Sequence, residues 1–352
     1  MTSSSISDFI SILIGSRGRQ SQLNNFLESI EETTTAKGKL EFALYVDEDD
    51  LETQEYLNAN IKRFSFSIRP CIKESPIALG EIQNTLWKTS LHRGGLFVTA
   101  MDDYIYTTKG WDEQIRDAFS KYPDRIALVY PEDPTAPELA TMPILSDQWI
   151  TTVGTFQTDY FPFWYNDVWL DEVAQMVQRK HKIDMKVSTQ GGKGKTARMR
   201  NLPFWQRFFL MMIIERLSEA EKLRSVIYKN NQSLQKESES MGRSLALKFL
   251  EMHDHSDEKL ITSEQELAAS TNWSDPRKLY SYITSELRAV HRASELLTYA
   301  FRMDDYGFIA RALDVISRAS LSIPELDIFR NAISRQTKLN YRALPEFKLP
   351  AQ

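Results

Sequence analysis

The sequence has one cysteine, no excess of basic charge and no long apolar run. Cys71 is the only cysteine among the 352 residues, so an intrachain disulfide and a thiolate metal cluster are both excluded. A chain of this kind fits a reducing, cytoplasmic setting. The formal net charge of −5 argues against nucleic acid as the main partner.

The sequence also lacks an apolar stretch near the about 18 residues that a membrane-spanning helix needs. The most apolar segment, residues 208–214, is far too short. Residues 1–5 lack the basic region and the apolar core of a signal peptide. We therefore expect no membrane span, and peripheral contact with a membrane stays open.

Short apolar runs alternate with helical patterns over the first part of the chain. The apolar runs, each interpreted as a strand, are residues 9–14, 40–46, 64–68, 95–100 and 126–130. Between them, apolar side chains recur at helical spacing. This order predicts an α/β fold with a mostly parallel, twisted sheet, flanking helices and right-handed crossovers.

The pattern changes near residue 201, where helical spacings replace the strands. We predict an α/β domain over residues 1–200, an all-helical C-terminal domain over 201–340 and an extended tail over 341–352. The C-terminal helices are candidates for binding the acceptor, a partner enzyme or a second copy of the chain, which leaves a homo-oligomer open.

Two adjacent carboxylates, Asp102 and Asp103, follow the strand predicted at residues 95–100. In open α/β sheets, ligands bind at the carboxyl ends of the strands. Carboxylate oxygens suit Mg²⁺ or Mn²⁺, which usually reach a protein through one or two carboxylates and substrate phosphates. A cation site at this strand end is one interpretation, and a plain Asp-Asp turn is the other.

The first predicted strand ends in a loop that contains Ser16, Arg17 and Arg19, and the second ends at Asp47. Backbone N–H groups and two guanidinium groups suit a bound nucleotide. The loop lacks the three-glycine spacing of a dinucleotide fingerprint. Alternatively, the loop with Arg17 and Arg19 is a solvated basic turn, and Asp47 is an ordinary acidic residue of a loop.

Four segments in this order resemble nucleotide-sugar glycosyltransferases of the GT-A fold, family-2-like. They are Ser-Ile-Leu-Ile-Gly-Ser-Arg-Gly-Arg at 11–19, Val-Asp-Glu-Asp at 46–49, Ala-Met-Asp-Asp at 100–103 followed by Gly110-Trp111, and Val-Gly-Thr-Phe at 153–156 followed by Asn166-Asp167. The sequence departs from the family at Met101, where a strict Asp-x-Asp register ending at Asp103 has its first carboxylate.

This resemblance implies transfer of a sugar from a nucleoside diphosphate, with a UDP-sugar favoured, to a hydroxyl of a glycan or another acceptor. It implies inversion at the anomeric carbon and a role in polysaccharide assembly. By the resemblance, Asp103 binds Mn²⁺ or Mg²⁺ with help from Asp102. The implied nucleotide-binding residues are Ser16, Arg17, Arg19, Asp47 and Asp102.

The resemblance also implies that Asp167 is the general base that takes the proton of the acceptor hydroxyl. A helix N-cap is the alternative role for this residue. The aromatic residues at 160–169 suit either a sugar face or the core, and Trp164 is our candidate for acceptor contact.

Residues 189–196, Thr-Gln-Gly-Gly-Lys-Gly-Lys-Thr, nearly match a P-loop, but Thr189 stands where that motif has glycine. Pro203 limits any helix after the loop. A P-loop-like NTPase is therefore the rival enzyme. A mobile lid whose Lys193, Lys195 and Arg198 contact a diphosphate is favoured over a P-loop, and a flexible, solvated linker is an equal alternative. A glycosyltransferase-like domain kept as a non-catalytic binding or scaffold module is a further rival, because of Met101.

Overall fold

The computed structural model describes residues 8–73, 79–91, 95–134, 136–158, 161, 165–190, 209 and 212–252. Trp164, the basic segment with Lys193, Lys195 and Arg198, and the helices predicted beyond residue 252 lie outside these residues.

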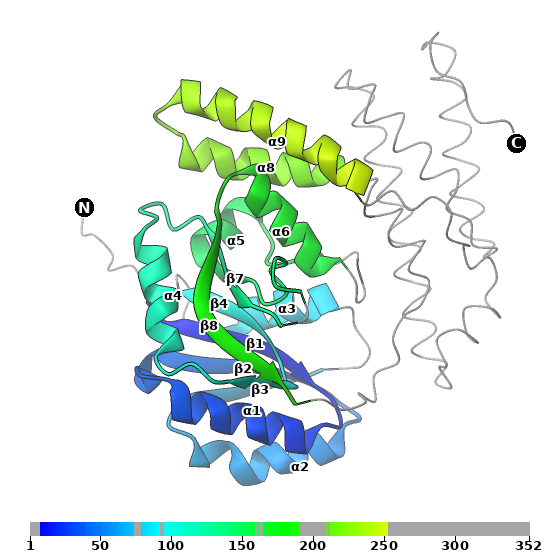
Figure 1. The fold of residues 1–352 in the computed structure, drawn as a ribbon. Coiled ribbons are helices and arrows are strands. Elements are labelled where there is room, and N and C mark those ends of the chain that lie inside the picture. The colour runs from blue at the N-terminus through cyan, green and yellow to red at the C-terminus, as the bar shows by residue number, and fades with distance from the viewer. Residues whose placement is uncertain are drawn as a thin grey trace, which may run out of the picture.

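Eight strands form one mixed sheet in the order β3-β2-β1-β4-β7-β6-β8-β5 (Figure 1). The strands are β1 (Ile10–Ser16), β2 (Leu40–Asp47), β3 (Ser67–Lys73), β4 (Leu96–Met101), β5 (Tyr104–Tyr106), β6 (Leu128–Glu132), β7 (Ile144–Ser146) and β8 (Lys180–Thr189). β3, β2, β1 and β4 run parallel, as do β6 and β8. β7 and β5 pair antiparallel with their neighbours. The α/β class is confirmed, and the sheet is more mixed than the apolar runs predicted.

The third strand lies several residues later than predicted. Residues 64–68 were expected to form it, but β3 begins at Ser67 and includes Pro70. Phe64 and Phe66 instead stack on each other, with ring centroids 5.4 Å apart. A proline is tolerated here because β3 is the edge strand of the described sheet.

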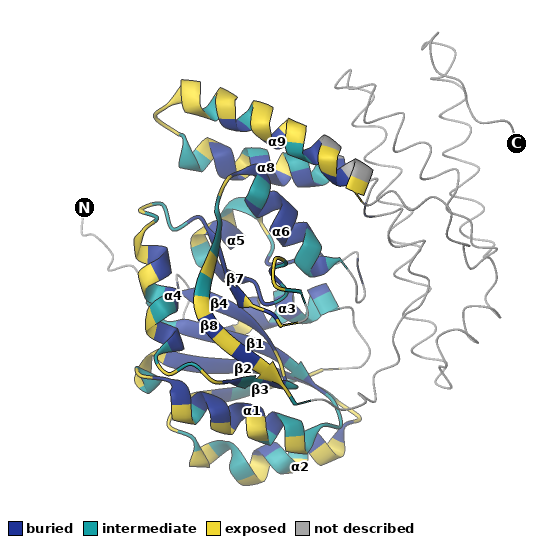
Figure 2. Cartoon of the chain, viewed as in Figure 1, coloured by how far each residue is buried: buried dark blue, intermediate teal, exposed yellow. Residues whose placement is uncertain are grey.

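Helices cover both faces of the sheet, and alternate side chains of β1 show the two layers. Ile12 and Ile14 pack in a core with α1, α2 and α4, whereas Leu13 packs in a core with α3, α5 and α6. Because both faces are covered, β1, β2 and β4 are mainly apolar and are almost entirely buried (Figure 2). The helices are α1 (Gln20–Thr33), α2 (Leu51–Asn60), α3 (Leu79–Thr89), α4 (Trp111–Ser120), α5 (Asp147–Val153), α6 (Asn166–Met176), α8 (Ile213–Ile227) and α9 (Gln232–Met252).

The helices α8 and α9 pack against α5 and α6 and share their core. Their buried apolar side chains include Ile213, Leu223 and Phe249. The predicted domain boundary at residue 200 stays a prediction, because the segment after Met252 is outside the described part of the chain. Among the described residues, no helix combines the length and the apolar character required to cross a membrane.

A buried ionic cluster joins α6 to α8. The Arg216 guanidinium is fully buried, and its Nε lies 2.8 Å from Oε2 of Glu172. Its central carbon lies 3.7 Å from the centroid of the Phe209 ring. Close by, Trp169 Nε1 donates a hydrogen bond to Glu219 Oε2 at 2.7 Å. Charges in such surroundings depend on one another, because water does not screen them.

We expect Glu219 to make the protein less stable as the pH rises. Loss of hydration raises the pKa of this buried carboxyl from 4.5 to about 7. Between these values the folded chain therefore binds one more proton than the unfolded chain, so the free energy of unfolding falls from pH 5 to pH 8, by on the order of 3 kcal/mol. Urea unfolding at both pH values measures this fall. Glu219→Gln keeps an acceptor for Trp169 without the charge, and its stability should be less dependent on pH. An equal pH dependence in both proteins would contradict the assignment.

Candidate functional site

The strands β2, β1 and β4 are neighbours, and polar side chains follow all three at the same edge of the sheet. Ser16, the last residue of β1, donates its hydroxyl to Asp102 Oδ2 at 2.7 Å. Arg19 Nη1 donates to Asp102 Oδ1 at 2.8 Å. The structure thus brings together three of the predicted nucleotide-binding residues, Ser16, Arg19 and Asp102, although Ser16 and Asp102 are 86 positions apart in the sequence.

Arg17 links the same loop to the acidic end of β2. Its Nη1 lies 2.8 Å from Asp47 Oδ2, and its Nη2 donates to Asp49 Oδ2 at 2.9 Å. The hydrogen bond to Asp49 raises the pKa of the guanidinium most, and the hydrogen bond to Asp47 raises it further. Arg17 therefore stays charged. Gly18 has a φ of 60°, and its N–H donates to Asp50 Oδ2 at 2.8 Å. The loop of β1 is therefore held against the turn that begins α2.

The two adjacent carboxylates differ in what they can bind. Asp102 is only 3% exposed and both of its oxygens already accept hydrogen bonds from Ser16 and Arg19. Loss of hydration raises the pKa of Asp102, and these two partners oppose the rise. The Asp103 side chain is 38% exposed and its Oδ2 lies 3.7 Å from Arg19 Nη1.

These residues fit a cation that is held by few protein ligands. Among the described residues, no three His, Cys, Asp or Glu side chains gather closely enough to form a metal site. Mg²⁺ and Mn²⁺ commonly bind through one carboxylate and the oxygens of a substrate diphosphate, which Asp103 can satisfy. Met101, at the position that resembles the first acid of the family motif, is 40% exposed at the same strand end. The predicted metal role therefore suits Asp103 better than Asp102.

Gln190, which the sequence did not single out, ties the end of β8 to this site. Its backbone N–H donates to the carbonyl oxygen of Asp103 at 2.8 Å, and its Nε2 donates to the carbonyl oxygen of Asp102 at 3.2 Å. Asn25 Nδ2 of α1 donates to Gln190 Oε1 at 2.9 Å. Thr189 and Gln190 are the first two residues of the P-loop-like stretch. These bonds therefore place the beginning of that stretch beside Asp102 and Asp103.

Asp167 lies in the first turn of α6. The N-cap position is Tyr165, which has a φ of 69° and makes no capping bond with its side chain. Asp167 Oδ1 accepts a hydrogen bond from the N–H of Val168 at 2.9 Å. Loss of hydration raises the pKa of Asp167, and the nearby carboxylates of Asp171 and Asp133 add to the rise. A carboxylate with a raised pKa is better matched to proton abstraction near neutral pH. The base role stays a prediction.

Asp133 is a second residue that the sequence did not single out. It follows β6, is 3% exposed, and its Oδ2 accepts hydrogen bonds from the hydroxyls of Tyr104 and Thr141, both at 2.8 Å. It lies just after the strand predicted at residues 126–130, as Asp47 and Asp102 lie after theirs, and this position was the signal that could have identified it.

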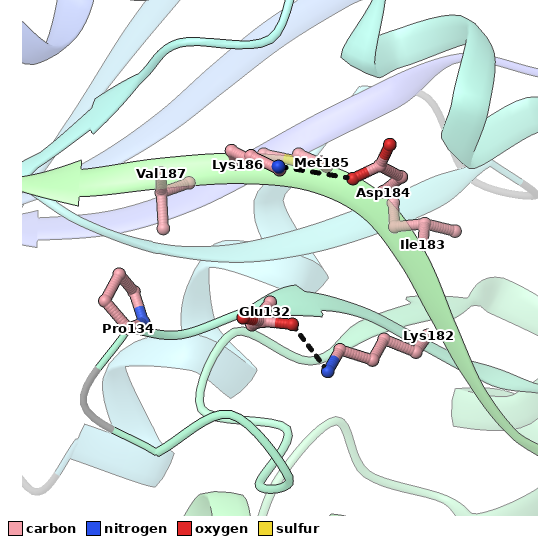
Figure 3. A pocket seen from close by; sticks show the side chains of 8 residues that line it. All are labelled: Glu132, Pro134, Lys182, Ile183, Asp184, Met185, Lys186 and Val187. Atoms are coloured by element: carbon pink, nitrogen blue, oxygen red, sulfur yellow. Dashed lines mark ion pairs between the residues drawn. The ribbon is translucent and has the colours of Figure 1, made fainter.

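A pocket of about 450 Å³ lies beside Asp133, between β6 and β8 (Figure 3). At this point a β-bulge shifts the register, so that Pro131 pairs with Ile183 but Glu132 pairs with Lys186. Glu132 Oε2 and Lys182 Nζ point toward each other at one side of the pocket, 2.7 Å apart. The lining mixes charged side chains with the apolar side chains of Pro134, Ile183, Met185 and Val187.

No family model and no curated protein matches the chain. Among solved structures, it is similar to residues 1–349 of S. aureus TarS in complex with UDP-GlcNAc, with a TM-score of 0.51, 9% identity and coverage of 95% of this chain and 92% of that chain. GalNAc-T7 with UDP, GalNAc and Mn²⁺ gives a TM-score of 0.48, 12% identity and coverage of 72% and 59%. The mannosyltransferase PcManGT from Pyrobaculum calidifontis, in complex with GDP-Man and Mn²⁺, gives 0.39, 10% identity and coverage of 80% and 85%. The chain thus has a GT-A-like fold, as the likeness to TarS and the order of its strands show.

Proposed function

We propose that this protein is a glycosyltransferase that moves a sugar from a nucleoside diphosphate to an acceptor hydroxyl. One observation carries the proposal. The loop of Ser16, Arg17 and Arg19 meets Asp47 and the Asp102–Asp103 pair at the carboxyl edge of three parallel strands. This is where ligands of open α/β sheets bind. The bound UDP-GlcNAc in TarS, a protein of similar fold, supports a UDP-sugar as the donor.

The charges at this edge suit a departing diphosphate. Arg17 and Arg19 provide two guanidinium groups that match phosphate oxygens in shape and charge. Asp103 would hold a Mg²⁺ or Mn²⁺ ion, and such an ion would supply further positive charge to the leaving oxygen. Asp47, in contact with Arg17, is the proposed partner of the nucleobase, and Asp102 is proposed to hold Ser16 and Arg19 in place.

Asp167 is the proposed general base. Its carboxylate takes the proton of the acceptor hydroxyl, and the oxygen forms a bond to the anomeric carbon. The bond from that carbon to the diphosphate breaks at the same time, and its electron pair leaves on the diphosphate. Attack from the face opposite the leaving group inverts the anomeric configuration. We place this transfer in the assembly of a polysaccharide.

A thermal-shift panel of UDP, GDP, CDP, TDP, ADP and ATP, each with and without Mn²⁺, tests the donor site. We expect UDP with Mn²⁺ to raise the melting temperature most. Ligand at 100 times its dissociation constant stabilises a native protein by about 2.7 kcal/mol. Asp103→Asn should lose the Mn²⁺-dependent part of the shift. The matched control is Asp184→Asn, which changes an acid that is highly exposed on β8.

Two other results would contradict the proposal. A shift with ATP alone that Lys195→Ala abolishes would favour a P-loop NTPase. Binding of UDP-sugars without transfer to any acceptor, under any metal, would favour a non-catalytic binding module.

A further inference from the structure

The side chain of Asp133 is buried, although the residues on either side of it line the pocket between β6 and β8. These two lining residues are Glu132 and Pro134 (Figure 3). This alternation is expected, because successive side chains of extended backbone point to opposite sides. A buried carboxylate is costly unless it accepts hydrogen bonds, and Asp133 accepts two from hydroxyl groups.

The first hydrogen bond ties Asp133 to the candidate donor site. Tyr104 donates its hydroxyl to Asp133 at 2.8 Å, and Tyr104 directly follows Asp103 in the sequence. Tyr104 is buried and is the first residue of β5, so its packed ring helps to fix the start of that strand. The position of Asp103 is therefore coupled to that of Asp133.

The second hydrogen bond leads from Asp133 to the helix that carries Asp167. Thr141 donates to Asp133 at 2.8 Å, and the N–H of the preceding residue, Ala140, donates to Asp171 Oδ1 at 3.0 Å. Asp171 lies one helical turn after Asp167, on the same side of α6. Lys180 Nζ of β8 holds the same Asp171 oxygen at 2.7 Å. A continuous set of hydrogen bonds and chain segments thus joins Asp103 to α6.

We propose that Asp133 is a positioning residue for sugar transfer, which sets the spacing between the donor-side Asp103 and the base Asp167. This inference rests on the proposed function. Reaction requires the acceptor oxygen and the anomeric carbon to lie about 3–3.5 Å apart and in line, and a misplacement of about 1 Å can cost about 100-fold in rate. Donor and acceptor are held by different segments. Asp133 bonds to Tyr104, beside Asp103, and to Thr141, whose neighbour Ala140 bonds to α6, so it helps to fix this distance.

Asp133 also acts on Asp167 through its charge. The carboxylates of Asp171 and Asp133 are the charged groups that add to the raised pKa of Asp167, after the loss of hydration. Removal of the Asp133 charge therefore lowers the pKa of Asp167. Because the base works in its deprotonated form, the acidic limb of the pH–rate profile moves to lower pH. A role in packing alone would leave this limb in place.

Steady-state transfer kinetics and donor binding test the inference on three variants. We expect Asp133→Asn to lower kcat by about 10- to 100-fold, with the dissociation constant for UDP unchanged and the acidic limb of kcat shifted to lower pH. Tyr104→Phe removes the hydrogen bond from Tyr104 to Asp133 and should lower kcat by a smaller factor. Tyr106→Phe is the matched control. It makes the same change two residues further along β5, where the buried hydroxyl has no hydrogen-bond partner among the described residues, and kcat should equal that of the unchanged protein.

The outcomes separate the inference from the proposed function. If the unchanged protein transfers sugar, and folded Asp133→Asn keeps its kcat and its pH profile, the positioning role is wrong. If Tyr104→Phe and Tyr106→Phe lower kcat equally, the hydroxyl bond to Asp133 is irrelevant and the role is again wrong. Absence of transfer by the unchanged protein would instead overturn the proposed function. If Asp133→Asn does not fold, as judged by circular dichroism, Tyr104→Phe and Thr141→Val decide the matter by the same two readouts.

Discussion

Asp167→Asn is expected to lower the rate constant for sugar transfer by about 10²- to 10⁴-fold, the range that a positioned general base contributes. Asparagine has nearly the shape of aspartate but cannot take the proton of the acceptor hydroxyl. Binding of UDP should be unchanged, because the carboxylates and arginines of the donor site come from β1, β2 and the end of β4. Single-turnover transfer, with donor affinity measured separately, distinguishes the two effects.

A second variant controls for the position of Asp167 at the start of a helix. Asp147 lies in the first turn of α5 and accepts a hydrogen bond from Trp87 Nε1 at 3.2 Å, which asparagine can also accept. Asp147→Asn loses a favourable interaction with the helix dipole, typically about 0.3–1 kcal/mol, and should not change the transfer rate. Normal turnover by Asp167→Asn would remove this residue as the base.

Arg216→Met is expected to destabilise the protein by about 3–5 kcal/mol, the usual cost of breaking a buried ion pair from one side. The substitution deprives the buried Glu172 carboxylate of a positive charge 2.8 Å away. It also removes the cation that lies over the Phe209 ring. Methionine retains much of the volume, so the loss is mainly electrostatic. Urea denaturation followed by circular dichroism measures it.

Two further variants sharpen this result. Arg216→Met combined with Glu172→Leu should recover part of the lost stability, because a buried pair replaced by apolar side chains is often neutral. Arg243→Met makes the same change at an exposed ion pair of α9, where the guanidinium lies 3.4 Å from Glu239, and should cost about 0.2–1 kcal/mol. Equal losses for Arg216→Met and Arg243→Met would show that burial does not set the cost.

The larger elements of the fold could be predicted from the order of the residues. β1, β2 and β4 are long enough, and buried enough on both faces, to appear as continuous apolar runs. The strands β5 and β7 have three residues each, which is too few for a periodic pattern to appear. The burial of Arg216 and Glu219 could not be predicted from the sequence either. Charged residues at helical spacing normally indicate a solvated face, but here they lie buried.

By itself, the sequence determined that acids would stand at the ends of β2 and β4, because parallel strands place their carboxyl ends at one edge of the sheet. Only the tertiary structure decided what those acids contact. Asp102 is turned inward by Ser16 and Arg19, Gln190 returns from β8 to the same turn, and Asp133 connects Tyr104 to Thr141. The physical reason is that burial and hydrogen-bond partners depend on segments far apart along the chain, such as Asn25 and Gln190, 165 positions apart, which come together only when the sheet and its helices pack.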